Sequence, residues 1–241
     1  IGSSAAPIIR QLTIAPRAVA RLNAESYFEI SDISPGAYVV VESDVDVAGF
    51  ELVKAPKGDS VALNARKSAE RLATLFFLQL SVLGPNKSQL GVVNYSAEPV
   101  ILTITAYKPD GSLYGSANLK SNPVTRTLVV GGALREDLES LFGFSGQQAL
   151  DGWISVKSTS NSVNGYVTYS DSSTGAAAVV TCSAEGQTRA VFSHIAAASG
   201  YYTSLSLLNP GSLVANVRIL ALKPTGEIMG SFDTVLEPNY R

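Results

Sequence analysis

Side chains that could act as nucleophile or general base are scarce in this sequence. It contains one histidine, His194, and one cysteine, Cys182. A Cys/His dyad twelve positions apart in a strand-rich stretch would need a fold-back and a third, orienting group, and none is evident. No Gly-x-Ser-x-Gly motif surrounds a serine, so nothing points to a Ser/His/Asp triad. In the internal repeat described below, Gln79 stands opposite His194, which favours a hydrogen-bonding role over general-base catalysis. We therefore expect a protein that is not an enzyme.

One pair of carboxylates could bind a metal ion. Asp44 and Asp46 lie in the stretch ESDVDV, and carboxylate oxygens are the ligands that Ca²⁺ prefers. The other copy of this stretch reads Ser-Asn-Ser at 160–162, so the site would occur only once, and the segment also fits a polar hairpin loop. The sequence predicts no cofactor, with Asp44 and Asp46 as the calcium candidate.

Aromatic side chains are the remaining candidates for binding. Trp153 is the sole tryptophan, and Tyr201 and Tyr202 follow a glycine in a predicted turn. Strand alternation places Trp153 opposite the core-facing residues Ile154 and Val156, so it could stack on a sugar ring, with the two tyrosines as a second platform. The alternative is that Trp153 covers the contact between two repeats or packs on a helix.

The composition excludes several classes of protein. Charged residues make up 16% of the 241, against an average of about 25%, and the net charge is −2, so a nucleic-acid partner is not expected. The longest apolar run, 72–84, is shorter than the roughly 18 to 20 residues that a membrane span needs. A single cysteine forms no intrachain disulfide, which is still compatible with secretion. The first residue is Ile1, and a cleaved signal peptide is one explanation for this start.

The chain contains an internal repeat. Residues 90–116 and 205–231 share nine identical residues at a shift of 115, and 36–53 resembles 152–169 at a shift of 116. The blocks alternate along the chain, so a unit that starts with the block at 90–116 is whole only in the middle of the sequence. We expect a repeat of about 115 residues, present twice.

The order of the blocks suggests how the units are divided. One unit would span 75–181, and the two chain ends, 1–70 and 188–241, would together form the second. The alternative is two sequential units, 11–125 and 126–241.

The local pattern is that of short strands joined by tight turns. Residues 101–106 alternate between two faces, and Lys-Pro-Asp-Gly at 108–111 and Lys-Pro-Thr-Gly at 223–226 are turn sequences that start a return strand. The stretch 133–143 has the apolar spacing of a short helix that ends at Gly143, and 15–24 occupies the equivalent place in the first repeat. We predict an all-β fold of two β-sandwich repeats, each with one short helix.

These turns, the short helix and the Gly-aromatic strands resemble the tandem immunoglobulin-like β-sandwich repeats of secreted or surface proteins of environmental bacteria. The resemblance covers most of 75–241 and rests on turn and core residues. It implies a non-catalytic structural or adhesive module at the cell surface or outside the cell, with the periplasm also open, and neighbouring repeats or proteins as partners. The alternative is a carbohydrate-binding module that binds surface polysaccharide through Trp153 or the tyrosine pair. A hydrolase without a recognisable motif is third.

Overall fold

The protein is built almost entirely of antiparallel β-structure. A computed structural model of the chain describes residues 8–31, 36–54, 60–65, 72–146, 149–184, 186–195 and 203–241. It is 43% strand and 5% helix, which confirms the predicted all-β class in this coarse sense. The elements in chain order are α1 (Ala24–Phe28), β1 (Phe50–Lys54), β2 (Ser60–Asn64), β3 (Thr74–Val82), β4 (Asn86–Asn94), β5 (Val100–Tyr107), β6 (Val124–Leu128), β7 (Ala133–Asp137), α2 (Leu138–Phe142), β8 (Leu150–Ser158), β9 (Val163–Asp171), β10 (Ala177–Thr181), β11 (Ala215–Leu222) and β12 (Ile228–Leu236).

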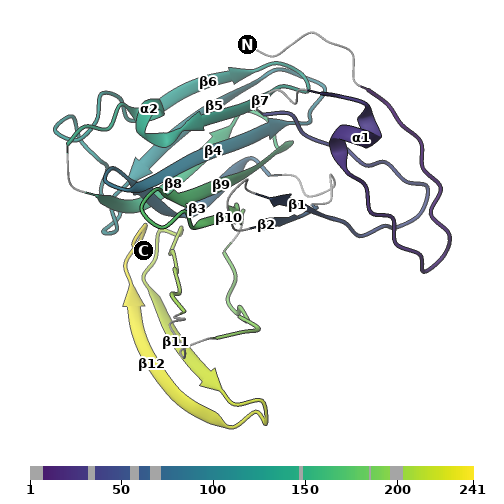
Figure 1. Ribbon diagram of the computed structural model, residues 1–241. Helices are drawn as coiled ribbons and strands as arrows, with labels where there is room; N and C mark the ends of the chain where they lie inside the picture. Colours follow the sequence, from purple (N-terminus) through teal and green to yellow (C-terminus); the bar gives the residue numbers. More distant parts are fainter. Residues whose placement is uncertain are drawn as a thin grey trace.

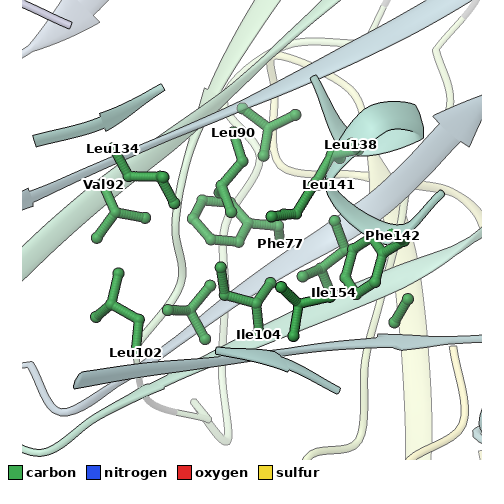
Figure 2. Close-up of a cluster of buried hydrophobic side chains, with 14 of the residues drawn as sticks. Phe77, Leu90, Val92, Leu102, Ile104, Leu134, Leu138, Leu141, Phe142 and Ile154 are labelled. Carbon is green, nitrogen blue, oxygen red and sulfur yellow. The ribbon is translucent and has the colours of Figure 1, made fainter. Parts of the chain in front are cut away.

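Two four-stranded sheets form the centre of the molecule (Figure 1). One has the order β10-β9-β4-β7 and the other β3-β8-β5-β6. Both sheets contribute to a single cluster of buried apolar side chains that runs from Leu72 to Cys182. Figure 2 shows side chains from both sheets and from α2 pointing toward one another. We call residues 72–182 the core unit.

Alternation along the strands explains which side chains enter this cluster. In β5, Leu102, Ile104 and Ala106 are fully buried, whereas Ile101, which precedes them on the strand, is 47% exposed. Because successive side chains of a strand point to opposite faces, one face of β5 covers the core and the other faces outward. The period-2 pattern predicted for 101–106 is therefore confirmed.

The predicted helix at 133–143 is only half helical. Residues Ala133–Asp137 form β7, which pairs with β4, and α2 occupies only Leu138–Phe142. The edge of β4 offers unpaired backbone groups to 133–137, and this non-local pairing outweighs the local helical pattern. The predicted C-terminal cap is confirmed, because Gly143 adopts φ +64° and its N–H donates to the carbonyls of the last helical turn.

The N-terminal helix lies further along the chain than predicted. Residues 15–18 form a turn, and α1 begins after Asn23, whose side chain accepts from the N–H of Ser26. Like α2, α1 has five residues, a glutamate in its first turn and a left-handed residue at its end, here Glu29. The two helices are thus equivalent at a shift of 114.

Both copies of the Lys-Pro-x-Gly turn have the same geometry. Gly111 donates to the Lys108 carbonyl at 3.0 Å and Gly226 to the Lys223 carbonyl at 2.9 Å. The two glycines have φ of +79° and +85°, which an L-residue adopts only with strain. The predicted return strand forms fully only in the second copy, where β12 follows β11 along its length. In the core unit the return segment makes a single bridge, Tyr107 to Leu113, and β6 supplies the pairing.

An asparagine performs the same task in both copies of the repeat. The amide of Asn94 donates to the carbonyls of Glu98 and Val129, both at 2.9 Å. The amide of Asn209 likewise donates to the residue four positions on, Leu213, at 2.7 Å, and to a second carbonyl across the structure. Each Asn oxygen also accepts from the N–H two residues on. The repeat read from the sequence is therefore a repeat of structure at this turn.

The two chain ends are attached to opposite ends of the core unit. The hydroxyl of Tyr38 donates to the Gly131 carbonyl at 3.0 Å, beside the start of β7. At the other end, the N–H of Arg241 donates to the Pro109 carbonyl at 2.9 Å, just after β5. In Figure 1 the β11–β12 hairpin extends away below the two sheets, and α1 lies at the opposite side. Within the described ranges, no helix is long and apolar enough to cross a bilayer.

Replacing Asn94 and Asn209 in turn tests whether the core unit is stable independently of the hairpin. Asn94→Ala removes the two hydrogen bonds that the amide donates and leaves the N–H of Ser96 without its acceptor, so we expect the free energy of unfolding of the core unit to fall by roughly 1 to 3 kcal/mol. Denaturant titration monitored by circular dichroism measures this change. Asn209→Ala is the matched control, because its partners lie in the hairpin, and it should leave the core transition unchanged. Equal losses from the two variants would contradict the independent stability of the core unit and the hairpin.

Candidate functional site

The residues predicted to do chemistry are not assembled into a site. Cys182 is buried, with its sulfur 3.7 Å from the Asn164 amide oxygen, whereas His194 is exposed. Asp44 and Asp46 are both on an exposed segment. Over the described ranges, no three His, Cys, Asp or Glu side chains form a group that could hold a metal ion.

Trp153 is not the exposed platform that the sequence suggested. Its side chain is 1% exposed and stacks on Tyr107, with ring centroids 3.9 Å apart and planes 5° apart. Phe76 flanks it at 6.3 Å. The indole does lie opposite Ile154 on β8, as alternation requires, but rings from the adjacent strands β3 and β5 pack against it. Burial therefore supports the packing role, and Tyr201 and Tyr202 lie outside the described residues.

Hollows in the described surface are shallow. One, about 150 Å³ in volume, lies beside α2, and small-molecule sites usually enclose about 300 to 1,000 Å³. A larger, open hollow of about 530 Å³ lies against the β11–β12 hairpin. Its lining residues come from the middle of the two strands: Asn216, Val217, Arg218, Asp233, Thr234 and Val235. The hairpin thus presents an open surface and no enclosed pocket.

No family model, curated protein or solved structure matches the chain. The core unit and its partial copies at the chain ends can still be compared with each other, residue by residue.

Apolar residues that are buried in the core unit are exposed in its partial copies. Val156 is fully buried, and its counterpart Val40 is 65% exposed. Phe77 is 1% exposed, and its counterpart Phe192 is 55% exposed. The described parts of the chain ends therefore expose apolar side chains whose counterparts are buried in the core unit. Large exposed apolar surfaces mark interaction sites.

The N-terminal region contains the same strand pair as the end of the core unit. β1 pairs with β2 so that Phe50 stands opposite Asn64, and β9 pairs with β10 so that Tyr166 stands opposite Thr181. The two hairpins keep one register and differ by a single residue in the loop. Together with α1, this region supplies equivalents of α2, β9 and β10. Residues 37–42, which lie between α1 and β1 in the sequence, correspond to β8 at a shift of 116.

The C-terminal hairpin contains the complementary part. β11 corresponds to β5, which in the core unit is bonded to β6 on one edge and to β8 on the other. In the core unit, the segment after the Lys-Pro-x-Gly turn bridges Tyr107 to Leu113, on the edge of β5 that also pairs with β6. β12 follows the second copy of this turn, so it pairs with the corresponding edge of β11. Among the described strands, none pairs with the other edge of β11. We call this the open edge, and it is our candidate functional site.

The charges beside the open edge cancel. Arg218 of β11 and Asp233 of β12 form a two-pronged ion pair with N–O distances of 2.7 and 3.2 Å. The hydrogen bonds from Arg218 lower the pKa of the Asp233 carboxyl, and those bonds raise the pKa of Arg218, so both groups stay ionised at neutral pH. What the surface offers a partner is therefore strand hydrogen bonds and apolar side chains rather than net charge.

Sequence analysis did not identify the open edge as a site, although one signal pointed there. The alternating order of the blocks places the counterpart of β8 at the N-terminal end of the chain, far in sequence from β11.

Trp153 provides an optical test of its burial. Because the ring is shielded and stacked, we expect a blue-shifted emission in the native protein and weak quenching by acrylamide. Both should change to free-tryptophan values in denaturant. A red, readily quenched emission in the native protein would contradict the packing of Trp153 against Tyr107 and restore it as a surface residue.

Proposed function

We propose that the protein is a non-catalytic structural module of a secreted or surface bacterial protein, made to join β-units to one another. The observation that carries the proposal is the complementarity of the chain ends. One end has strands equivalent to the later part of the core unit, and the other end has strands equivalent to its earlier part. Both sets expose apolar side chains that are buried in the core unit.

For the fold, we propose that each complete unit is an immunoglobulin-like β-sandwich. Two four-stranded antiparallel sheets that share one apolar cluster support this, because alternating inward-facing residues of two sheets form the core of such folds.

For the division of the chain, we propose one whole unit at 75–181 and two part-units at 1–70 and 188–241 that together supply a second. The pairing of β4 with β9, and of β3 and β5 with β8, favours this over sequential units at 11–125 and 126–241, because all three pairings would cross the boundary between sequential units. A boundary at 125 would cut through β6, which is bonded to β5.

No described residue favours the two other functions. A carbohydrate-binding module loses its Trp153 platform because the indole is covered. For the hydrolase, His194 lies on an exposed segment, and the buried Cys182 lies against the amide oxygen of Asn164. A structural role needs only stable units and surfaces that join them.

Location and activity can be tested together on the protein in its own cells. We expect protease added to intact cells, or to the medium, to degrade the protein without lysis. We also expect the purified chain to turn over none of a panel of ester, glycoside, peptide and phosphate substrates. Protection from protease until lysis would contradict the proposed location. Turnover that is lost in His194→Ala would contradict the structural role.

A further inference from the structure

We propose that the open edge of β11 binds residues 37–42 of a second copy of this chain as an added β-strand, so that copies join head to tail. The inference rests on register and on the positions of the two segments, and it does not depend on where the protein is located or on its proposed cellular role.

The core unit gives the register of this pairing. β5 and β8 are antiparallel, with Thr103 opposite Lys157 and Ile104 opposite Val156. Shifts of 115 for β5 and 116 for β8 convert these pairs to Arg218 opposite Val41 and Ile219 opposite Val40. The full set continues in the same order: Val217 with Glu42, Leu220 with Val39, Ala221 with Tyr38 and Leu222 with Ala37.

The side chains brought together by this register suit the pairing. Val40 and Ile219 take the places of Val156 and Ile104, which are both fully buried. On the outer face, Val39, 57% exposed, meets Leu220, 46% exposed. Aliphatic pairs directly across two strands stabilise a sheet, and the added strand also satisfies the N–H and C=O groups of the open edge.

A second apolar segment of the acceptor copy corresponds to β3, the other neighbour of β8. In the core unit β8 lies between β5 and β3, with Phe76 opposite Ser155 and Phe77 opposite Ile154. The described residues that correspond to β3 are 189–195, where Val191 is 80% exposed and Phe192 is 55% exposed. The incoming segment 37–42 would thus have β11 on one side and could meet the apolar residues of 189–195 on the other, as β8 lies between β5 and β3.

The positions of the two segments favour a second copy over the same chain. Gly36 lies against Arg135 of β7, and Tyr38 is bonded to Gly131, at one end of the core unit. The base of the hairpin is fixed at the other end, where Arg241 forms an ion pair with Asp151 at 2.7 Å. β5 has eight residues, so the two anchors are separated by about 25 Å, the length of such a strand. The donor segment and the acceptor hairpin are thus anchored at opposite ends of the core unit.

The proposed contact is heterologous, because a different surface of each copy takes part. Two different surfaces meet, so each joined pair leaves one donor and one acceptor free, and repeated addition yields an open chain of copies unless the rotation closes a ring. The hydrogen bonds of strand addition supply affinity, and the alternating apolar side chains supply the register.

Cysteine cross-linking tests both the register and the source of the strand. Two single-cysteine chains, Val41→Cys and Arg218→Cys, are made in a Cys182→Ala background and mixed under mild oxidation. We expect a disulfide-linked dimer that contains the 41–218 peptide pair. The yield should be at least about tenfold above that of Arg218→Cys mixed with Val45→Cys, whose position lies roughly 13 Å further along the strand, beyond disulfide reach.

Two further chains make every result interpretable. Thr103→Cys with Lys157→Cys in one chain calibrates the chemistry, because these residues already stand opposite each other in the core unit. Val41→Cys with Arg218→Cys in one chain should give a ladder of linked copies. A monomeric disulfide there, with no product from the mixed chains, would show that the strand comes from the same chain and would overturn the proposal. Equal yields from Val41→Cys and Val45→Cys would overturn the register, and no product from either would overturn the docking.

Discussion

The strand β8 is the element on which the rest of the structure depends. Its backbone is bonded to β3 on one side and to β5 on the other, so it holds together the sheet β3-β8-β5-β6. Its two faces are both buried, with Ile154 and Val156 in the core and Trp153 stacked on Tyr107 outside it. A strand that lacks such a neighbour keeps a row of unpaired N–H and C=O groups, and the open edge of β11 is the direct consequence.

Local patterns predicted the parts of the fold that local physics controls. The alternation in β5 and the Lys-Pro-x-Gly turns were readable because strand period and the positive φ of glycine depend on a few neighbouring residues. The start of α2 was not, because 133–137 fits either a helix or a strand, and its pairing with β4, about 45 residues away, decides between them. The side on which Trp153 lies was predictable, but its cover comes from Phe76 and Tyr107, which the sequence alone does not bring near.

The candidate site was predictable in kind but not in place. The order of the repeat blocks predicts that the ends of the chain are complementary. The relative position of those ends depends on two long-range contacts, Tyr38 with Gly131 and Arg241 with Asp151, which are 93 and 90 residues apart in the sequence. Residue spacing in the sequence does not predict such contacts. The sequence predicted that the two ends of one chain form one unit, whereas the anchoring of these ends leads to the proposal that the ends of two different copies pair.

Hydrogen exchange measured at increasing protein concentration tests the central claim most directly. In an antiparallel edge strand, alternate N–H groups point away from the partner strand, so half of the amides of β11 are unbonded in a single copy. The account predicts that these outward amides of Val217–Leu222 become protected as concentration rises, together with those of residues 37–42, while the amides of β5 keep their protection throughout. Rapid exchange of the outward β11 amides at every concentration would contradict it.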